Sequence, residues 1–599
     1  MDYRDALSYI ESKNSLGIMP GLDVILELLS GLGHPEGAVP ALHIAGTNGK
    51  GTIMSYVEHA MLQAGMRVGR YLSPAVLDYR EKWHINGEMV SEEDIVSCME
   101  EIRAVAETMP QSPTSFEIET ALAFLLFRRK NCDVMLVECG MGGRLDATNV
   151  IPQKVLDILA SVSMDHMQFL GDTREKILNE KLGIVKPGDV LVTAPMDEEL
   201  RNVVRTYPFP DMGEEGIVFT PMEELSVQRE DILGTDFTFR NETYHIRMPG
   251  DVALENAITA LMALEVYNKR AGQFGLPQLT QEQIREGLAA ADWQGRFTVF
   301  DTHPMMIVDG AHNRDAWLRL AETIRRFFRD RKITFVLGVL ADKEVDTMID
   351  ALVPLAKRIH VFTPESPRAL AGEKLKSRIL AYCAETEQPI MQETDPVSCE
   401  ESALSAAGKA LQESSEEDVI VACGSLTFLG GLIKARGALE MDRVTRILND
   451  AFYKKQIKKI YESEYDREYC RHGFGHAISV ARIAYILALE NRCTVRKDVV
   501  YAASLLHDIG RYTPEEKELG HHAAGAGVAE DVLIRAGYTE AERKVICEAI
   551  RAHKNPQEDS ALLAGILYRA DKLSRNCFLC DARESCYWPE ERKNRSILC

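Results

Sequence analysis

The chain has 599 residues, of which 46% are hydrophobic and 27% are charged. This composition is typical of a folded globular protein and excludes wholesale disorder, and the length predicts three or four domains. The 69 Lys and Arg residues against 91 Asp and Glu residues give a net charge of −22, which argues against a nucleic-acid or anionic-membrane binder. The polar N-terminal segment and the lack of a long apolar run predict a cytoplasmic protein without a signal peptide or membrane span.

The predicted elements change in character near residue 440. Before it, β-rich runs at 41–45, 134–137, 156–162, 305–308, 333–337, 359–362 and 419–422 alternate with helical patterns. This alternation predicts an α/β fold with mostly parallel sheets covered by helices, and a hinge near 292–296. Residues 441–599 have a helical pattern throughout, which predicts a separate all-α domain. We therefore expect three domains, at 1–296, 297–436 and 441–599.

A glycine-rich loop follows the first predicted strand and precedes a helix. Its residues are Gly46, Thr47, Asn48, Gly49, Lys50, Gly51 and Thr52. Glycines let backbone N–H groups converge on an anion, and a helix N-terminus favours negative charge. We expect this loop to bind nucleotide phosphates, with Lys50 reaching the β- and γ-phosphates, although its spacing differs from the usual GxxxxGK[ST] pattern.

Further motifs accompany this loop in a fixed order. They lie at 17–23, Ser73-Pro74 with Glu81-Lys82 and Asn86-Gly87, 115–117, 138–149, Asp165-His166 with 170–173 and 180–184, Pro249-Gly250 with Asn256-Ala257, 293–296, 309–313 and 366–369. Together they resemble the folylpolyglutamate synthase/dihydrofolate synthase family of the Mur ligase superfamily, over residues 1 to about 436.

The resemblance implies a fold and an activity. The fold would be a P-loop Mur-ligase-like central domain followed by a Rossmann-like glutamate-ligase domain. The activity would be ATP-dependent addition of L-glutamate to tetrahydrofolate, to dihydropteroate or to both, through an acyl phosphate. A Mur-type peptidoglycan ligase is the rival within the superfamily, and the motifs at 180–184 and 309–313 disfavour it. We expect small-molecule substrates only, no nucleic-acid or membrane partner, and a monomeric chain.

The same resemblance implies the active-site residues of this half. Ser73 and Glu138 would hold one Mg²⁺, His166 would ligate a second metal that Glu138 could bridge, and Lys181 would be a carbamoylated lysine that serves as a further ligand. Asn256, Arg296 and Asp309 would contact ATP, and His312 would be a further active-site residue. The expected catalytic side chains are Lys50, Glu138, His166, Lys181, Arg296 and His312. Two departures, Ala75 and Lys82, stand where the family has His and Arg.

Histidine and aspartate residues recur on the predicted C-terminal helices. His476, the pair His507-Asp508 and Asp571 form an H…HD…D series that resembles the HD-domain metal phosphohydrolases. The resemblance implies that these four residues bind a divalent transition metal, with Asp508 catalytic, and that His522 and His553 add ligands for a second ion. We expect His521 and His472 to be ordinary polar residues. The hypothesis is hydrolysis of a phosphorylated pterin or nucleotide, and the alternative is a sensing or scaffold module without turnover.

The C-terminal tail carries the remaining candidate ligands. Cys577 and Cys580 form a Cys-x-x-Cys pair, Cys586 follows, and Cys599 ends the chain. Thiolates in this pattern can hold zinc or an iron–sulfur cluster. Unliganded thiols are the alternative.

Overall fold

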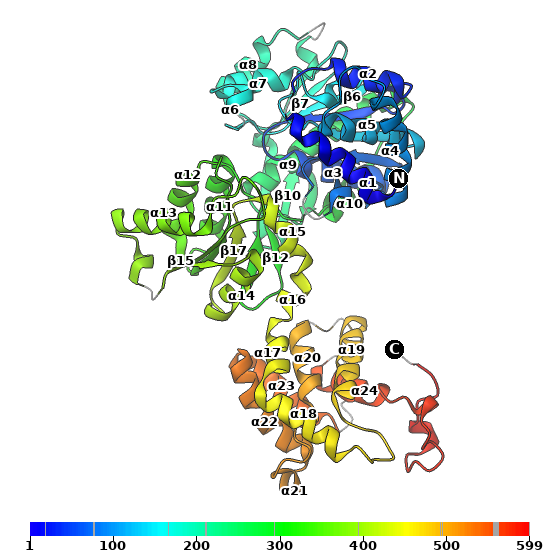
Figure 1. Ribbon diagram of the computed structural model, residues 1–599, viewed down its shortest axis with the longest axis vertical. Coiled ribbons are helices and arrows are strands. Elements are labelled where there is room, and N and C mark those ends of the chain that lie inside the picture. Colours follow the sequence, from blue (N-terminus) through cyan, green and yellow to red (C-terminus); the bar gives the residue numbers. More distant parts are fainter. Residues whose placement is uncertain are drawn as a thin grey trace. The chain divides into compact units, whose positions relative to one another are not determined.

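The computed structural model describes residues 1–17, 19–75, 78–165, 167–209, 213–292, 294–392, 395–491, 493, 495–554 and 562–597. The chain divides into two compact units, Met1–Ala435 and Arg436–Cys599 (Figure 1). Among the described helices, none combines the length and apolar character that crossing a membrane requires.

An eight-stranded sheet forms the centre of the first unit. Its strand order is β4-β3-β2-β5-β1-β6-β7-β8. Strand β3 is antiparallel to β2 and β4, and the other neighbours are parallel. The strands are β1 (Ala41–Ala45), β2 (Val68–Tyr71), β3 (Trp83–Ile85), β4 (Glu88–Met89), β5 (Val134–Glu138), β6 (Lys154–Leu159), β7 (Leu191–Thr193) and β8 (Ile217–Phe219).

Helices cover both faces of this sheet because alternate strand residues point to opposite sides. Leu42 and Ile44 of β1 pack into a core with α3, α9 and α10, whereas Ala41 packs into a second core with α1, α2, α4 and α5. The helices of this region are α1 (Tyr3–Ser12), α2 (Asp23–Gly31), α3 (Lys50–Gln63), α4 (Glu92–Ala106), α5 (Ser115–Arg129), α6 (Met167–Leu170), α7 (Arg174–Leu182), α8 (Glu198–Thr206), α9 (Asp251–Arg270) and α10 (Gln281–Ala290).

A small antiparallel sheet, which we did not predict, lies between α8 and α9 in the chain. Its strands are β9 (Leu225–Asp231), β10 (Gly234–Phe239) and β11 (Glu242–Ile246), in the order β11-β10-β9. Phe237 and Tyr244 stack with ring centroids 5.5 Å apart and join the core that contains α9. This packing attaches the small sheet to the helix that carries Asn256.

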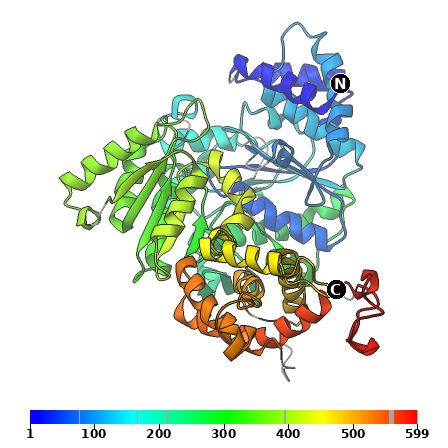
Figure 2. The same ribbon diagram turned by 60° about the horizontal axis from the view of Figure 1, so that its bottom comes forward.

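A six-stranded sheet follows, in the order β12-β13-β17-β14-β15-β16, with only β12 antiparallel among its described strands. Figure 2 shows its green strands side by side with helices packed along them. Its elements are β12 (Thr298–Phe300), β13 (Met305–Val308), α11 (Arg314–Phe327), β14 (Ile333–Leu337), α12 (Val345–Leu352), β15 (Ala356–Phe362), α13 (Gly372–Glu385), β16 (Val397–Glu400), α14 (Ala403–Glu413), β17 (Val419–Cys423) and α15 (Leu426–Lys434). The α/β fold predicted for this half is confirmed.

The second unit is helical, as predicted, and has its own apolar core. Its helices are α16 (Arg436–Glu440), α17 (Asp442–Asn449), α18 (Ala451–Ser463), α19 (Phe474–Glu490), α20 (Lys497–Leu506), α21 (Glu516–Leu519), α22 (His521–Ala536), α23 (Glu540–Ala552) and α24 (Leu563–Leu573). The helical prediction fails beyond α24, where the described tail contains only two 3-10 turns, Cys577–Leu579 and Glu590–Arg592.

Candidate active sites

The loop between β1 and α3 lies at the carboxyl end of the parallel strands, where open α/β sheets bind ligands. Gly49 has a φ of +89°, and a Cβ there would lie 2.4 Å from Oδ1 of Asn256. Gly46 has a φ of +154°, and its added Cβ would lie 2.6 Å from that of Ala160. Both positions therefore require glycine, and the N-terminus of α3 faces the loop as in an anion site.

Charged side chains meet beside this loop. Nζ of Lys50 donates hydrogen bonds to the carbonyls of Gly46 (3.0 Å) and Thr47 (3.2 Å) and lies 3.5 Å from Oε1 of Glu138. Oε2 of Glu138 accepts the backbone N–H of Ser73 at 3.4 Å. Nζ of Lys181 donates to the Gly46 carbonyl at 2.8 Å. Two lysine amines and one carboxylate thus share the loop.

Burial controls the protonation of these groups. Lys181 is 4% exposed, and its burial, together with the charge of Lys50, lowers the pKa of its amine to about 7. Burial raises the pKa of the Glu138 carboxyl, although Lys50 opposes that shift. A large fraction of Lys181 is therefore a neutral amine near pH 7, unlike an ordinary lysine.

Two cavities open on the loop. The larger, of about 660 Å³, is lined by residues 47–52, Ser73, Glu138 and Arg296. The smaller, of about 120 Å³, is lined by Asn48, Asn256, Arg296 and Asp309 among others. Both oxygens of Asp309 accept backbone N–H groups at 2.8 Å, Oδ2 from Phe297 and Oδ1 from Ala311, which fix the carboxylate in place.

Hydrogen bonds also join the loop to the start of α11. Nδ2 of Asn48 donates to Oδ2 of Asp315 at 3.2 Å, and Nδ2 of Asn313 donates to Oδ1 of Asn48 at 3.1 Å. Nδ1 of the neighbouring His312 lies 2.8 Å from the Gly310 carbonyl. Burial, aided by Arg296, lowers the pKa of His312 to about 4, so this imidazole is neutral.

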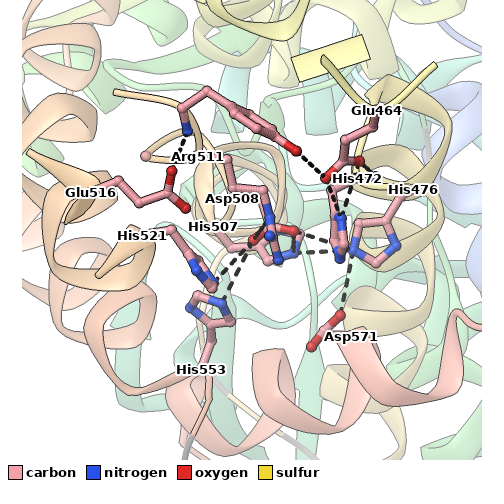
Figure 3. Close-up of polar contacts among 12 residues, drawn as sticks. Glu464, His472, His476, His507, Asp508, Arg511, Glu516, His521, His553 and Asp571 are labelled. Atoms are coloured by element: carbon pink, nitrogen blue, oxygen red, sulfur yellow. Dashed lines mark hydrogen bonds and ion pairs between the residues drawn. The ribbon is translucent and has the colours of Figure 1, made fainter. Parts of the chain in front are cut away.

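A second constellation lies in the helical unit, where six side chains from five helices converge (Figure 3). They form two groups, and within each group the donor atoms lie within 4.8 Å of one another. His476, His507 and Asp571 form the first group, and Asp508, His521 and His553 form the second. All but His476 are buried. Histidine nitrogens and carboxylate oxygens in this mixture suit first-row transition ions.

Asp508, a member of the second group, also lies close to the histidines of the first group. Its Oδ2 is 3.2 Å from Nε2 of His507 and 3.7 Å from Nε2 of His476. Its Oδ1 is 3.5 Å from Nε2 of His521 and 4.0 Å from Nε2 of His553. This geometry suits a carboxylate that bridges two ions.

Backbone carbonyls orient two of the imidazoles. Nδ1 of His507 lies 2.6 Å from the Ser504 carbonyl, and Nδ1 of His553 lies 2.5 Å from the Ile550 carbonyl. With Nδ1 as the donor, each Nε2 presents its lone pair to the centre, as in metal-bound histidines.

Protonation at this centre also favours cation binding. Burial lowers the pKa of His521 to about 3 and that of His553 to about 4, which keeps both imidazoles neutral. Although burial acts in the opposite direction, His507 holds the pKa of Asp508 well below its usual range. Asp508 in turn raises the pKa of His507, so a proton and a metal cation compete for the same nitrogen.

Cationic side chains surround the carboxylates. Nε of Arg511 lies 2.8 Å from Oδ1 of Asp508, Lys572 pairs with Asp571, and Arg575 lies 3.9 Å from Oδ2 of Asp571. A site that combines metal donors with three nearby cations favours an anionic ligand.

The two regions match different protein families. Residues 44–264 match the Mur ligase middle domain, residues 295–426 match the Mur ligase glutamate ligase domain, and residues 473–576 match the HD domain. The dihydrofolate synthase/folylpolyglutamate synthase of Bacillus subtilis is 34% identical over 389 residues, which are 62% of this chain and 88% of that protein. The chain belongs to the dihydrofolate synthase/folylpolyglutamate synthase family.

Further relatives agree with this assignment. The folylpolyglutamate synthase of Lacticaseibacillus casei is 32% identical over 62% of this chain and 87% of its own length. Escherichia coli FolC in complex with DHPP and ADP superposes with a TM-score of 0.61 at 28% identity, covering 73% of this chain and 98% of that one. The Thermotoga maritima folylpolyglutamate synthase superposes with a TM-score of 0.60 at 29% identity, covering 73% of this chain and 96% of that one. This chain is thus a synthase of that family that also carries an HD domain.

The structure brings most of the predicted synthase residues together. Lys50, Ser73, Glu138 and Lys181 converge on the loop, and Gly51 and Thr52 line the larger cavity. Asn256, Arg296 and Asp309 line the smaller cavity. The predicted ligand His166 lies outside the described residues. The sequence analysis missed the contacts of Asn48 with Asp315, because nothing in either segment signals a partner so distant in the chain.

The structure corrects one histidine of the HD domain. His521, which we expected to be an ordinary polar residue, occupies the place that we predicted for His522. Consecutive residues of a helix point about 100° apart, so only one of the two can face the centre. Gly525, one turn after His521, packs so tightly on Gly510 that a Cβ on Gly510 would lie 2.2 Å from its nitrogen. The sequence alone did not separate the two histidines, because His522 is also followed at i+4 by a small residue, Ala526.

The metal-binding prediction for the tail cysteines stays a prediction. Cys577, Cys580 and Cys586 are free thiols of the described tail, outside the histidine–aspartate centre. Cys599 lies outside the described residues.

Proposed function

We propose that the first unit binds ATP across its two cavities and activates a substrate carboxylate as an acyl phosphate. The observation that carries this proposal is the convergence of Lys50, Glu138 and Lys181 on a helix-terminal glycine loop. The smaller cavity would take the adenosine, with Asn256, Asp309 and Arg296 as its polar contacts. The larger cavity would take the phosphates and the folate or dihydropteroate. The structure of the related E. coli protein in complex with DHPP and ADP supports the binding of a nucleotide together with a second ligand.

Each loop residue has a role that follows from its position. Lys50, at the N-terminus of α3, would exchange its bonds to loop carbonyls for the β- and γ-phosphates. Ser73 and Glu138, with His166, would hold Mg²⁺, which would neutralise phosphate charge. The carboxylate oxygen would attack the γ-phosphorus as ADP leaves, and the amine of glutamate would then displace phosphate to form the amide.

Lys181 would act as a carbamate. Its amine, with a pKa of about 7, would attack CO₂ and lose a proton to give an N-carboxylate. This change turns a buried cation into an anionic oxygen ligand. The replacement of an ammonium by a carboxylate also removes the repulsion from Lys50 that depresses the pKa.

An acceptor comparison tests this half. Glutamate-dependent ADP formation would be measured with dihydropteroate, with tetrahydrofolate and with a UDP-linked Mur acceptor. Turnover with either pterin supports the proposal, and the ratio of the two identifies the preferred step. Turnover with the UDP-linked acceptor alone would show that the chain acts as a peptidoglycan ligase.

We further propose that the HD domain is a metal-dependent phosphohydrolase. The observation that carries this proposal is the placement of Asp508 between two donor groups with Arg511 at its side. Two divalent transition ions, such as Mn²⁺ or Fe²⁺, would lower the pKa of a water and offset phosphate charge. Arg511 and Lys572 would hold the phosphate oxygens, and the neutral His521 and His553 would keep their nitrogen lone pairs available as ligands.

Phosphate release from full-length protein tests this second activity. The Lys50→Ala background removes ATP hydrolysis by the synthase half, and Asp508→Ala is the control for contaminating phosphatases. Mn²⁺- and Fe²⁺-loaded protein would be given dihydroneopterin phosphates and a nucleotide panel. A preference for pterins supports a folate-related substrate, and a preference for nucleotides supports hydrolysis of another substrate. Metal binding without turnover of any phosphate ester would favour a sensing or scaffold module.

A further inference from the structure

Two segments that are more than 100 residues apart pack together near the end of the chain. The hydroxyl of Tyr469 donates to the Ser585 carbonyl at 3.1 Å, and its ring meets that of Tyr587 with centroids 5.8 Å apart. Oγ of Ser585 donates to Oε1 of Glu468 at 2.9 Å. These contacts bring together the two segments that carry Cys470 and Cys586, because each cysteine adjoins the contacting residues in sequence.

The other two tail cysteines lie in the same region. Cys577 and Cys580 bracket a 3-10 turn in which the Cys580 N–H donates to the Cys577 carbonyl at 3.4 Å. The guanidinium carbon of Arg575 lies 4.0 Å from the centroid of the Trp588 ring, which holds the residues before Cys577 against those after Cys586. The three cysteines at 470, 577 and 580 are free, as is Cys586.

The tail lacks the apolar core that ordinarily holds a segment of this length. Among the described residues 574–597, Ala582 is the one buried apolar side chain, while Leu579 and Ile597 are each 79% exposed. Polar contacts return the chain to α24: Nδ2 of Asn594 donates to the carbonyls of Lys572, Leu573 and Arg575 at 2.8–3.1 Å. A short coreless segment rich in cysteine is the situation in which a bound metal commonly supplies the folding free energy.

We propose that Cys470, Cys577, Cys580 and Cys586 form a four-thiolate site for a soft metal, either a zinc ion or an iron–sulfur cluster. The fourth ligand comes from the segment before α19 and not from the C-terminal Cys599. Among the described residues, the groups of three or more donors already within 4.8 Å consist of histidines and carboxylates. The four thiols must therefore approach one another as they lose their protons to bind the metal, and binding would draw the two segments together.

The four-thiolate site would stabilise the geometry of the HD centre. Cys470 precedes the ligand His476 by six residues, and Cys577 follows the ligand Asp571 by six. Oγ of Ser574, between Asp571 and Cys577, lies 3.3 Å from Nδ1 of His476. A metal that joins the two thiol-bearing segments would therefore fix the spacing of His476 and Asp571, which come from different helices.

Metal analysis of the full-length protein tests the site. Protein purified without oxygen would be assayed for zinc, iron and acid-labile sulfide per chain, and then loaded with Co²⁺ to record thiolate-to-cobalt charge-transfer bands. We expect these bands in the wild type and in Asp508→Ala, which disables the HD centre. Zinc alone, or iron with sulfide, at the thiolates would each support the site and would identify its occupant.

Variants decide which thiols take part. Cys470→Ser and Cys580→Ser should each weaken or abolish the thiolate bands, whereas Cys493→Ser, in the same unit, should leave them unchanged. Bands in Cys470→Ser equal to those in Cys493→Ser would overturn the assignment of Cys470. Absence of thiolate bands in the cobalt-loaded wild type would overturn the site.

A measurement on the wild type covers the case in which the variants do not fold. Alkylation of the intact protein, mapped by mass spectrometry, should label these four cysteines only after a chelator removes the metal. Equal labelling with and without the chelator would also overturn the proposal.

Discussion

The adjacent histidines at the start of α22 give a matched test of the HD centre. We predict that His521→Ala weakens metal binding strongly and that His522→Ala does not. Nε2 of His521 lies 3.5 Å from Oδ1 of Asp508, and the residue is 6% exposed. His522 belongs to neither donor group of the described residues. Each substitution replaces His with Ala in the same helical turn, so the change in helix propensity is nearly the same for both.

The magnitude follows from the donor count. Removal of His521 leaves Asp508 and His553 as the donors of their group. Loss of an outer-shell partner already weakens metal binding about 10–100-fold, so loss of a ligand should cost at least about 100-fold, or about 3 kcal/mol. Titration with Mn²⁺, followed by measurement of bound metal and phosphate release, would give both affinities. A loss in His522→Ala equal to or larger than that in His521→Ala would refute the assignment.

Three further predictions concern other parts of the chain. Lys50→Ala should abolish glutamate-dependent ADP formation, measured in a coupled assay, because it removes the cation at the phosphate loop; full activity would refute the loop assignment. Gly188→Ala should lower the free energy of unfolding by about 1–2 kcal/mol in denaturant titrations, since its backbone is left-handed and its Cβ would meet no atom within 4 Å, whereas Gly49→Ala, with the same backbone and a Cβ 2.4 Å from Oδ1 of Asn256, should lower it more and should also raise the KM for ATP. Against the effect of burial, His472 lowers the pKa of Glu464 from its ordinary 4.5 to about 2. The ionised carboxylate therefore stabilises the fold above pH 4.5, and this contribution is lost as the pH falls from 4.5 toward 2. Calorimetric acid titration should therefore show wild type and Glu464→Gln converging in stability over that window, and a constant difference would contradict this role.

Local patterns predicted the sites whose residues are close together in sequence. The glycine loop lies between β1 and α3 as expected, because a strand, a tight turn and a helix follow directly from residue type over about twenty positions. The paired His507 and Asp508 were found for the same reason. The strands at 305–308 and 333–337 coincide with β13 and β14, since their apolar runs are short and well bounded.

Features that depend on tertiary packing were not predictable in the same way. The choice between His521 and His522 depends on which face of α22 packs against Gly510, which lies in the turn after α20. The proximity of Cys470 to the tail depends on contacts such as that of Tyr469 with Ser585, more than 100 residues away. By contrast, the strands β10 and β11 were predictable, because Phe237 and Phe239, and Tyr244 and Ile246, alternate with polar residues as in a half-buried strand.

The proposed sites differ in the hardness of their donors, and this difference bears on how one chain can serve two chemistries. The synthase site offers oxygens of Ser73 and Glu138, and the proposed carbamate on Lys181 would add another, a donor set that suits Mg²⁺. The HD centre offers imidazoles and carboxylates, which suit first-row transition ions, and the tail offers thiolates, which suit zinc or iron–sulfur clusters. Because each donor set prefers a different ion, the sites need not compete for one metal. A chelator selective for transition ions should therefore silence phosphate-ester hydrolysis by the HD domain while Mg²⁺-dependent ligation, followed as ADP formation, continues, and simultaneous loss of both activities would show that the two halves are coupled.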